Sequence, residues 1–152
     1  MNLELKIPPA AVAIGFGIIM WALQQWLPMY WPRGGLWFWP AVVTASAGVV
    51  MGILGLLEFY RHATTINPHK PAKASSLVDS GVYRLSRNPM YLALACVLLS
   101  WGFYLGSAAS LLLIPLFVWY MNRFQIIPEE RIMIEKFGDA YRRYQSAVRR
   151  WI

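Results

Sequence analysis

The sequence predicts an all-α fold, a polytopic membrane bundle of four transmembrane helices plus a C-terminal amphipathic cytosolic helix. Composition is the first observation behind this prediction, because 58% of the 152 residues are hydrophobic and only 14% are charged, unlike an ordinary soluble domain. Length is the second, since four apolar stretches each approach the roughly 20 residues with which a helix crosses about 30 Å of hydrocarbon. We expect residues 1–152 to form a single membrane domain.

The predicted spans cover residues 7–27, 36–60, 89–105 and 107–127, and the third is the shortest. We expect the first span to stay in the mature chain, because its apolar core exceeds the roughly 7 to 15 residues of a signal peptide and no small-residue cleavage site follows it. A polar loop, residues 61–88, connects the second and third spans. A connection of this length tends to be functional or disordered.

Local features inside the spans predict how the helices pack. Gly48 and Gly52 form a Gly-x-x-x-Gly pair, which lets a neighbouring helix approach closely. Pro115 removes a backbone hydrogen bond and clashes with the preceding turn, so a bend is expected one turn before it. Glu58 and Arg61 are three residues apart on a helix, a spacing that predicts an ion pair at the end of the second span.

Lysine and arginine lie almost entirely on one side of the predicted bundle. Such residues are retained in short cytoplasmic loops far more often than they are translocated, so both termini are predicted to be cytosolic. The opposite side carries only Arg33 and a charge-free turn, and Trp and Tyr collect there at the ends of the spans, where such rings anchor in the headgroup layer. The basic residues on the cytosolic side are Lys6, Arg61, Lys70, Lys73, Arg84, Arg87 and those from Arg123 onward.

The net charge of +7 does not predict nucleic-acid binding, because membrane topology alone produces positive charge beside the spans and no nucleic-acid module is recognisable. Membrane lipids with anionic headgroups are the expected partners instead. The single cysteine, Cys96, lies in the middle of the third span and is interpreted as a small buried hydrophobic residue. No metal site is expected, and the oligomeric state is left open.

Residues 128–150 predict an amphipathic helix that begins at Pro128, a residue suited to the first helical position. Gly138 interrupts it, at a cost of about 1 kcal/mol relative to alanine, so a break or a close contact is expected there. The helix would lie on the membrane surface or fold over the cytosolic mouth of the bundle. Its apolar face consists of Ile134, Phe137, Tyr141, Tyr144 and Val148.

The long loop and the C-terminal helix can meet as one cytosolic cap over the ends of the second, third and fourth spans. Glu129 and Glu130 lie in the first turn of the predicted helix, where acidic side chains complement the helix dipole by roughly 0.3 to 1 kcal/mol. Arg87 has the position of a topology charge and Tyr91 that of an interface anchor. From these residues alone, structural roles and roles in a functional site both remain open.

Several motifs occur together in this cap. They are Leu77-Val78-x-Ser80-Gly81-Val82-Tyr83, then Arg87-x-Pro89-x-Tyr91, then Glu129-Glu130 followed by Phe137-Gly138-x-x-Tyr141-x-x-Tyr144 and Val148-x-Arg150. In this order and spacing the series resembles the isoprenylcysteine carboxyl methyltransferase and phospholipid methyltransferase superfamily of integral membrane enzymes. The resemblance covers about half of the chain, residues 64–151, and the first two spans carry no matching signature.

The resemblance implies methyl transfer from S-adenosyl-L-methionine to a lipophilic small-molecule or lipid-linked acceptor. A carboxylate and aromatic rings suit the cationic sulfonium of that donor. Arg87 and Glu129 are the implied catalytic residues, Arg87 orienting a carboxylate or the cofactor through its planar fork. Gly81 is implied to be a turn glycine, Pro89 a helix starter and Glu130 a secondary candidate. The implied cofactor-binding residues are Leu77, Val78, Gly81, Tyr83, Asn88, Pro89, Tyr91, Glu129 and Glu130.

The chain departs from the family pattern at Asn88, where the family commonly has histidine. Asparagine replaces a neutral imidazole as a hydrogen-bond partner but cannot take up a proton. His62 and His69 are the only histidines, and the polar loop is an ordinary surface setting for His69. We therefore expect positioning of donor and acceptor to supply most of the rate enhancement, an effect that reaches roughly 7 to 11 kcal/mol. A carboxylate or thiolate acceptor needs little more, whereas a protonated amine needs a base.

Two other function classes are compatible with the sequence. Membrane sterol reductases have a similar C-terminal region and use NADPH, although they usually carry Trp where this chain has Tyr141, which favours methyl transfer. A non-catalytic scaffold would use the Gly48 and Gly52 face to bind a partner. The compact four-span form is more similar to prokaryotic members of the superfamily, which predicts the prokaryotic inner membrane with the active site facing the cytosol.

Overall fold

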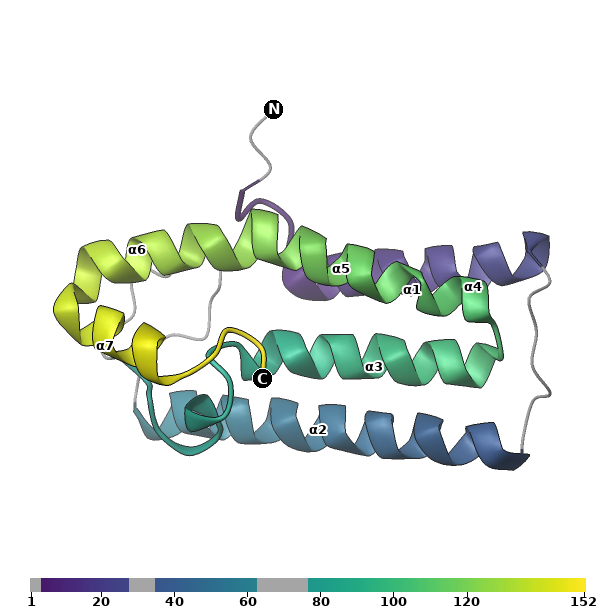
Figure 1. Cartoon of the computed structure of the whole chain (residues 1–152), viewed down its shortest axis with the longest axis horizontal. Helices are drawn as coiled ribbons and strands as arrows, with labels where there is room; N and C mark the ends of the chain where they lie inside the picture. The colour runs from purple at the N-terminus through teal and green to yellow at the C-terminus, as the bar shows by residue number, and fades with distance from the viewer. Residues whose placement is uncertain (1–3, 28–34, 63–76) are drawn as a thin grey trace.

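The computed structural model describes residues 4–27, 35–62 and 77–152, and these ranges form helices joined by turns (Figure 1). The long helices run lengthwise through the molecule, and the short C-terminal helix closes one end (Figure 1). The expectation of an all-α fold is confirmed for the described ranges.

Proline begins two of the first three long helices, and glycine ends one of them. α1, Pro9–Trp26, and α3, Pro89–Leu105, both begin at a proline, whose fixed backbone angle and missing N–H suit the first helical position. α2, Phe38–Arg61, follows a single 3-10 turn, η1, Gly35–Trp37. α3 stops at Gly106, which adopts a left-handed φ of 66° that a residue with a Cβ disfavours.

The predicted fourth span is interrupted where its proline requires it. α4, Ala108–Leu111, ends before α5, Leu113–Met121, and the expected bend one turn before Pro115 is confirmed. The helix then continues through a π-helical turn, η4, Asn122–Ile126, into α6, Ile127–Phe137. A helix that begins at Pro128 is therefore not what the chain forms.

The N-terminal segment explains how the helix passes through Pro128. A proline at this position cannot bond the carbonyl of Phe124, four residues earlier. That carbonyl instead accepts a hydrogen bond from the backbone N–H of Leu5, at 3.0 Å. Because membrane helices tolerate proline when a neighbour satisfies the freed carbonyl, the helix continues without an unpaired group.

The C-terminal amphipathic segment predicted for residues 128–150 consists of two helices, and the break expected at Gly138 is confirmed. α6 ends at Phe137, and α7, Asp139–Ala147, follows directly after Gly138. Gly138 has φ 52° and ψ −125°, a conformation that residues with a Cβ rarely adopt, so the chain bends sharply here. Val148 then returns to extended backbone and ends the second piece.

The protein is an integral membrane protein by the length and composition of its helices. Three described helical segments are long and apolar enough to cross a membrane: Pro9–Trp26, Gly35–Arg61 and Ala108–Phe137. α3 is apolar as well but has only 17 residues.

α3 is the central helix of the bundle. It packs against α1, α2, α4 and α5, and Figure 1 shows it between α2 and the helices of the opposite layer. Its contact with α2 is close, because a Cβ on Gly48 would lie 3.0 Å from the carbonyl oxygen of Ala93. The small-residue face of α2 is thus covered by a helix of the same chain, and Gly48 is not available to a partner protein.

Candidate functional site

The residues singled out in the sequence gather at one end of the bundle. A 3-10 turn, η3, Gly81–Arg84, leads into the start of α3, and α6 and α7 fold over the same end (Figure 1). The chain end, residues 148–152, runs back to the beginning of α3, and we call it the C-terminal strap (Figure 1). The turn η3, the start of α3, α6, α7 and the strap therefore all contribute side chains to one region.

Tyr91 and Glu129 meet at the centre of this region. Tyr91 is buried in the first turn of α3, and its phenol donates a hydrogen bond to Oε1 of Glu129 on α6. Because α6 continues from η4, Glu129 does not sit at a free helix N-terminus, and the helix dipole does not account for its position. Within the described ranges, Glu129 is paired with a phenol rather than with a cation.

Glu130 has a different environment, although it is adjacent in sequence. Its carboxylate accepts hydrogen bonds from Arg150 Nε at 3.1 Å and Nη2 at 2.7 Å, and it forms an ion pair with Arg87 at 3.0 Å. The side chains of Glu130 and Arg87 are each 9% exposed. Two guanidinium groups thus neutralise one buried carboxylate, and the bond to Glu130 raises the pKa of Arg150 further.

The C-terminal strap is fastened to the loop before α3 by hydrogen bonds to its backbone carbonyls. The Arg87 N–H donates to the carbonyl of Arg149 at 3.0 Å, and Asn88 Nδ2 donates to the carbonyl of Arg150 at 2.9 Å. The indole of Trp151 donates to Oδ1 of Asn122 in the π-helical turn, at 3.0 Å. The strap thereby links the start of α3 to η4.

Arg87 has one polar atom without a hydrogen-bond partner in the structure. Its Nη1 donates to the carbonyl of Gln145 at 3.3 Å and its Nη2 faces Glu130, but its Nε is buried and unpartnered among the described residues. A buried N–H without a partner is costly, so such an atom calls for an explanation.

An aromatic and aliphatic wall lines the loop side of the region. Tyr141 and Tyr144 of α7 pack against Val78, Val82 and Tyr83, and Leu77 lies against this cluster. The Tyr144 phenol donates to the backbone carbonyl of Tyr83 at 2.7 Å, which fixes α7 on the turn. Burial raises the pKa of both Tyr141 and Tyr144 well above the ordinary value, so both phenols stay protonated.

Tyr83 connects this wall with the acidic pair. Burial is the main cause that raises the pKa of its phenol, and the Tyr144 phenol and the Glu129 carboxylate raise it further. The ring also meets Phe59 of α2 edge to face, with centroids 5.5 Å apart. Tyr83 is thus neutral and held on the α2 side of the site, within electrostatic range of Glu129.

The turn at Gly81 is anchored on the end of α2. The Ser80 hydroxyl donates to Oε2 of Glu58 at 2.5 Å, and Glu58 also pairs with Arg61 at 3.1 Å, as the sequence predicted. Gly81 has φ 55°, and a Cβ placed on it would lie 2.5 Å from Oε1 of Glu58. Only glycine fits this place without displacing the carboxylate.

Most of the expected site residues come together, but they divide into three environments. Tyr91 and Glu129 are joined by a hydrogen bond, Tyr83 lies in the aromatic wall, and Arg87 and Glu130 form a charge network. The remaining expected residues have structural surroundings: Leu77 and Val78 lie in the wall, Gly81 in the turn, and Asn88 and Pro89 at the start of α3. His69 and the stretch around it lie outside the described residues.

Two partners of the site were not expected from the sequence. Arg150 belongs to the last motif, yet nothing in its spacing indicates that it reaches back 20 residues to Glu130. Ser80 likewise gives no signal of its bond to Glu58, which lies 22 residues earlier. Both bonds depend on how α7 and the turn fold back over the bundle.

Comparison with known proteins assigns the chain to a family. The model of the phospholipid methyltransferase family matches residues 36–140, more than two thirds of the chain. The chain belongs to the phospholipid methyltransferase family. The matched range includes α2, α3 and α6, and with them Tyr91, Glu129 and Glu130, whereas α1 and the C-terminal strap lie outside it.

Two relatives extend this assignment. A 63-residue stretch, 41% of this chain, is 46% identical to the full length of an uncharacterized protein from Haemophilus influenzae. A 79-residue stretch, 52% of this chain, is 33% identical to the protein-S-isoprenylcysteine O-methyltransferase of Schizosaccharomyces pombe and spans 34% of that protein. No solved structure gives a significant match. Membership of this membrane methyltransferase superfamily is thus confirmed at the level of the family.

Proposed function

We propose that the protein transfers a methyl group from S-adenosyl-L-methionine to a lipophilic acceptor at the cytosolic membrane face. The observation that carries the proposal is the Tyr91 and Glu129 pair, which joins two family-matched helices at one end of the bundle. The family match and the fission yeast relative support methyl transfer as the reaction class.

The chemistry of the site suits a cationic methyl donor. A sulfonium is attracted by a carboxylate and by the faces of aromatic rings, and the Glu129 carboxylate accepts a hydrogen bond from the Tyr91 phenol. Glu130 is less suited, because Arg87 and Arg150 already neutralise it. Glu129 would therefore hold the donor, and Tyr91 would orient the Glu129 carboxylate by its hydrogen bond.

Arg87 would hold the reacting partner in place. Its unpartnered Nε is a buried donor at the edge of the site, and its Nη2 is fixed by Glu130. A carboxylate of the acceptor or of the donor would satisfy that N–H. Glu130 and Arg150 would be positioning residues for Arg87. Leu77, Val78, Gly81, Asn88 and Pro89 would shape the cofactor pocket through the wall, the turn and the start of α3.

The donor supplies an electrophilic methyl group, and the acceptor nucleophile displaces a neutral thioether. The side chains would contribute alignment and exclusion of water, a proximity effect worth roughly 7 to 11 kcal/mol. His62, the histidine in the described ranges, has its ring Nδ1 2.9 Å from the backbone carbonyl oxygen of Glu58. An acceptor that is already anionic, a carboxylate or a thiolate, fits these residues better than a protonated amine.

The membrane setting completes the proposal. α1, α2, α3 and the helix from Ala108 to Phe137 would be four spans of a single membrane domain in a prokaryotic inner membrane, with both termini cytosolic. The basic residues around α7 and the strap support this orientation, because positive charge is retained on the cytoplasmic side. Membrane lipids are the expected surroundings, and no nucleic acid is expected.

Calorimetry on the detergent-purified protein tests the proposal. Titration with S-adenosylmethionine and with its demethylated product is expected to give saturable heat, and NADPH is expected to give none. The donor should also raise the thermal stability, because a ligand that binds only the folded state stabilises it. Stabilisation by NADPH and not by the donor would replace methyl transfer with the reductase function, and absence of any signal with the donor would refute the proposal.

A further inference from the structure

Glu58 is a buried carboxylate to which the proposed reaction assigns no role. It lies in the last turn of α2 and is 7% exposed, whereas the side chain of its ion-pair partner, Arg61, is 72% exposed. A pair with an exposed cation compensates little for the burial of a charge. The bond that chiefly holds the carboxylate is therefore the one from the Ser80 hydroxyl, at 2.5 Å.

The turn η3 packs on the end of α2, over this carboxylate (Figure 1). A Cβ on Gly81 would lie 2.5 Å from Oε1 and 3.0 Å from Cγ of Glu58, so the bare backbone of the turn covers the end of that side chain. The next residue of α2, Phe59, holds the ring of Tyr83 edge to face, with centroids 5.5 Å apart. Two adjacent residues of α2 thus hold the turn at its first and third residues.

The turn supports three parts of the candidate site. Tyr83 belongs to it, and the backbone carbonyl of Tyr83 accepts the hydrogen bond from Tyr144 that fixes α7, at 2.7 Å. The N–H of Ser86 donates to the carbonyl of Val82 at 3.2 Å, so the chain that leads to Arg87 is bonded to the turn as well. A shift of the turn would therefore move Tyr83, Arg87 and α7 together.

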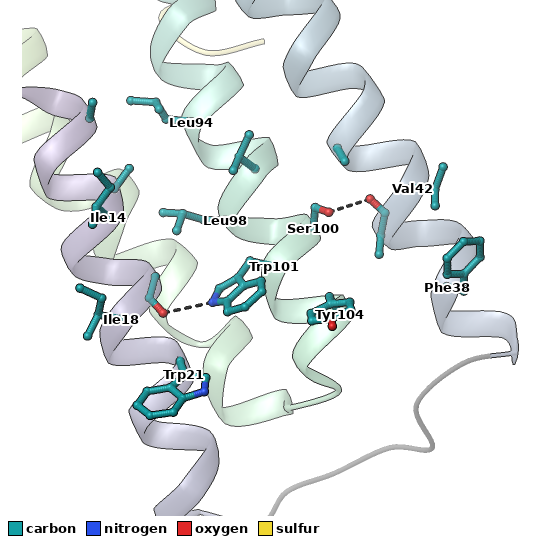
Figure 2. Close-up of a pocket in the computed structure, with 16 residues that line it drawn as sticks. Ile14, Ile18, Trp21, Phe38, Val42, Leu94, Leu98, Ser100, Trp101 and Tyr104 are labelled. Atoms are coloured by element: carbon teal, nitrogen blue, oxygen red, sulfur yellow. Dashed lines mark hydrogen bonds between the residues drawn. The ribbon is translucent and has the colours of Figure 1, made fainter.

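The bundle itself is held by bonds in which Glu58 takes no part. The Ser100 hydroxyl ties α3 to α2 by donating to the carbonyl of Ala41 at 2.7 Å (Figure 2). The Trp101 indole ties α3 to α1 by donating to the carbonyl of Gly17 at 3.1 Å (Figure 2). Both bonds lie in the last third of α3, whereas the candidate site lies at its start. Loss of the Glu58 bond should therefore loosen the turn without opening the bundle.

We propose that Glu58 is a positioning residue for the donor site, which acts through its bond to Ser80 to hold the turn η3, and with it Tyr83, in place for the methyl donor. The role of the turn in donor binding rests on the proposed function. Glu58 acts through the turn and not by contact with the donor, because its carboxylate is bonded to Ser80 and covered by Gly81. A misplacement of about 1 Å can cost about 100-fold in rate, so such an anchor has a measurable effect.

Three serine variants test the positioning role. Ser80→Ala removes the hydroxyl, and Ser80→Thr keeps it on extended backbone, φ −104° and ψ 172°, which suits a β-branched residue. Ser100→Ala is the matched control, because it also removes a serine hydroxyl that links a helix to α2, but far from the turn. Calorimetry with S-adenosylmethionine, below the melting temperature of every variant, is expected to give a Kd about tenfold higher for Ser80→Ala and within about twofold of wild type for the other two. Equal Kd values for Ser80→Ala and Ser100→Ala would overturn the proposal.

A double-mutant cycle shows whether Glu58 acts through Ser80. Glu58→Gln removes the charge that strengthens the bond, so it is expected to raise the Kd of the donor as Ser80→Ala does. Because both changes weaken the same bond, the combined variant should bind the donor within about twofold of Ser80→Ala alone. Full multiplication of the two single effects would show that Glu58 influences the donor by another route, and it would overturn the positioning role.

Hydrogen exchange without donor separates this proposal from the function on which it rests. In Ser80→Ala the amides of residues 81–87 are expected to exchange faster, among them the Tyr83 N–H that bonds the Ser80 carbonyl at 3.0 Å, while the last turns of α3 exchange as in the wild type. Unchanged exchange at residues 81–87 would overturn the proposal. Faster exchange with an unchanged Kd would leave Glu58 a purely structural residue and overturn it as well. Absence of donor binding by the wild type would instead refute the proposed function, and with it the part of the proposal that concerns the donor.

Discussion

Glu129 and Glu130 show at the residue scale how two adjacent carboxylates acquire different tasks. One faces a phenol that donates a single hydrogen bond, and the other is enclosed by two guanidinium groups. A carboxylate without a cation retains its attraction for a cationic ligand, whereas a neutralised one contributes to structure. The two residues should therefore respond differently to the same substitution.

Glu129→Gln is expected to weaken binding of S-adenosylmethionine and to leave the fold intact. The amide keeps the shape but loses the charge, and a hydrogen bond or contact to a charged group is worth about 1.5 to 3 kcal/mol, which corresponds to a roughly 10- to 100-fold increase in Kd. Calorimetry with the donor measures this change. Glu135→Gln, on the exposed side of the same helix, is the control and should bind as the wild type does.

Glu130→Gln is expected to destabilise the protein instead. It leaves Arg87 and Arg150 without their shared counter-ion, and breaking a buried pair by removal of one partner costs about 3 to 5 kcal/mol. Thermal denaturation in detergent, compared with Glu135→Gln, gives the result. An unchanged melting temperature together with lost donor affinity would contradict this assignment and make Glu130 a ligand of the donor.

Gly81→Ala is expected to disturb the turn that precedes α3. Gly81 has φ 55°, which costs a residue with a Cβ about 1 to 2 kcal/mol, and the new Cβ would push against the carboxylate of Glu58. The matched control is Gly15→Ala, because Gly15 lies inside α1 with open space beside it. That substitution should be neutral or slightly stabilising. Equal thermal stabilities for the two variants would contradict the geometry of the turn.

The sequence was sufficient for the residues that the family motif contains, and insufficient for their partners. Tyr91 and Glu129 were expected in one site, and the structure joins them by a hydrogen bond. The pairing of Glu130 with Arg150 was not expected, because it requires the chain to reverse at Gly138 and return as an extended strap. The positive φ of Gly138 makes that reversal possible, and the sequence predicted a break at this glycine but not the path of the chain after it.

At the scale of elements, the N-terminal segment acts as a clamp on η4 and α6. Leu5 satisfies the carbonyl freed by Pro128, and Gln125 Nε2 donates to the carbonyl of Ile7 at 2.7 Å. Glu4 bridges Arg123 of the π-helical turn at 2.7 Å and Arg131 of α6 at 3.0 Å. The clamp thus holds together the two segments that position Glu129.

The clamp predicts a dependence of stability on acid. Hydrogen bonds from Arg123 and Arg131 lower the pKa of Glu4 below its ordinary value of 4.5. A carboxyl group whose pKa is lower in the folded state stabilises that state above its unfolded pKa, and the contribution disappears as the pH falls through the folded value. The melting temperature of the wild type should therefore decrease more than that of Glu4→Gln when the pH is lowered from 6 to below about 4.5. Identical pH profiles would show that the clamp contributes nothing.

Sequence patterns at this scale predicted where prolines interrupt the helices, but not which distant residues replace the missing hydrogen bonds. Pro115 ends α4 where a proline must, one turn before its ring. Pro128 also predicted a helix boundary, but the helix continues through it. Leu5, from a distant part of the chain, supplies the hydrogen bond that the proline cannot make. Local rules describe what a proline removes, and tertiary contacts decide whether the helix ends there.

At the scale of the whole molecule, α3 joins the candidate site to the centre of the bundle. Its first turn carries Tyr91 at the end where α6, α7 and the strap gather, and its length packs against α1, α2, α4 and α5. The candidate site is thus fixed to the central helix at one end of the bundle.

This arrangement requires the end with α7 to face the cytosol, where a water-soluble methyl donor is present. In a Cys96→Ala background, Ser146→Cys on α7 and Leu36→Cys in η1 place single thiols at exposed positions on opposite ends of the bundle. A membrane-impermeant maleimide applied to intact spheroplasts is expected to label Leu36→Cys and to label Ser146→Cys only after permeabilisation. The prediction follows from the basic residues of α7 and the strap, because Lys and Arg are retained on the cytoplasmic side. Labelling of Ser146→Cys in sealed spheroplasts would show the opposite orientation. The proposed donor site would then face away from the compartment that supplies the donor, which contradicts the proposed function.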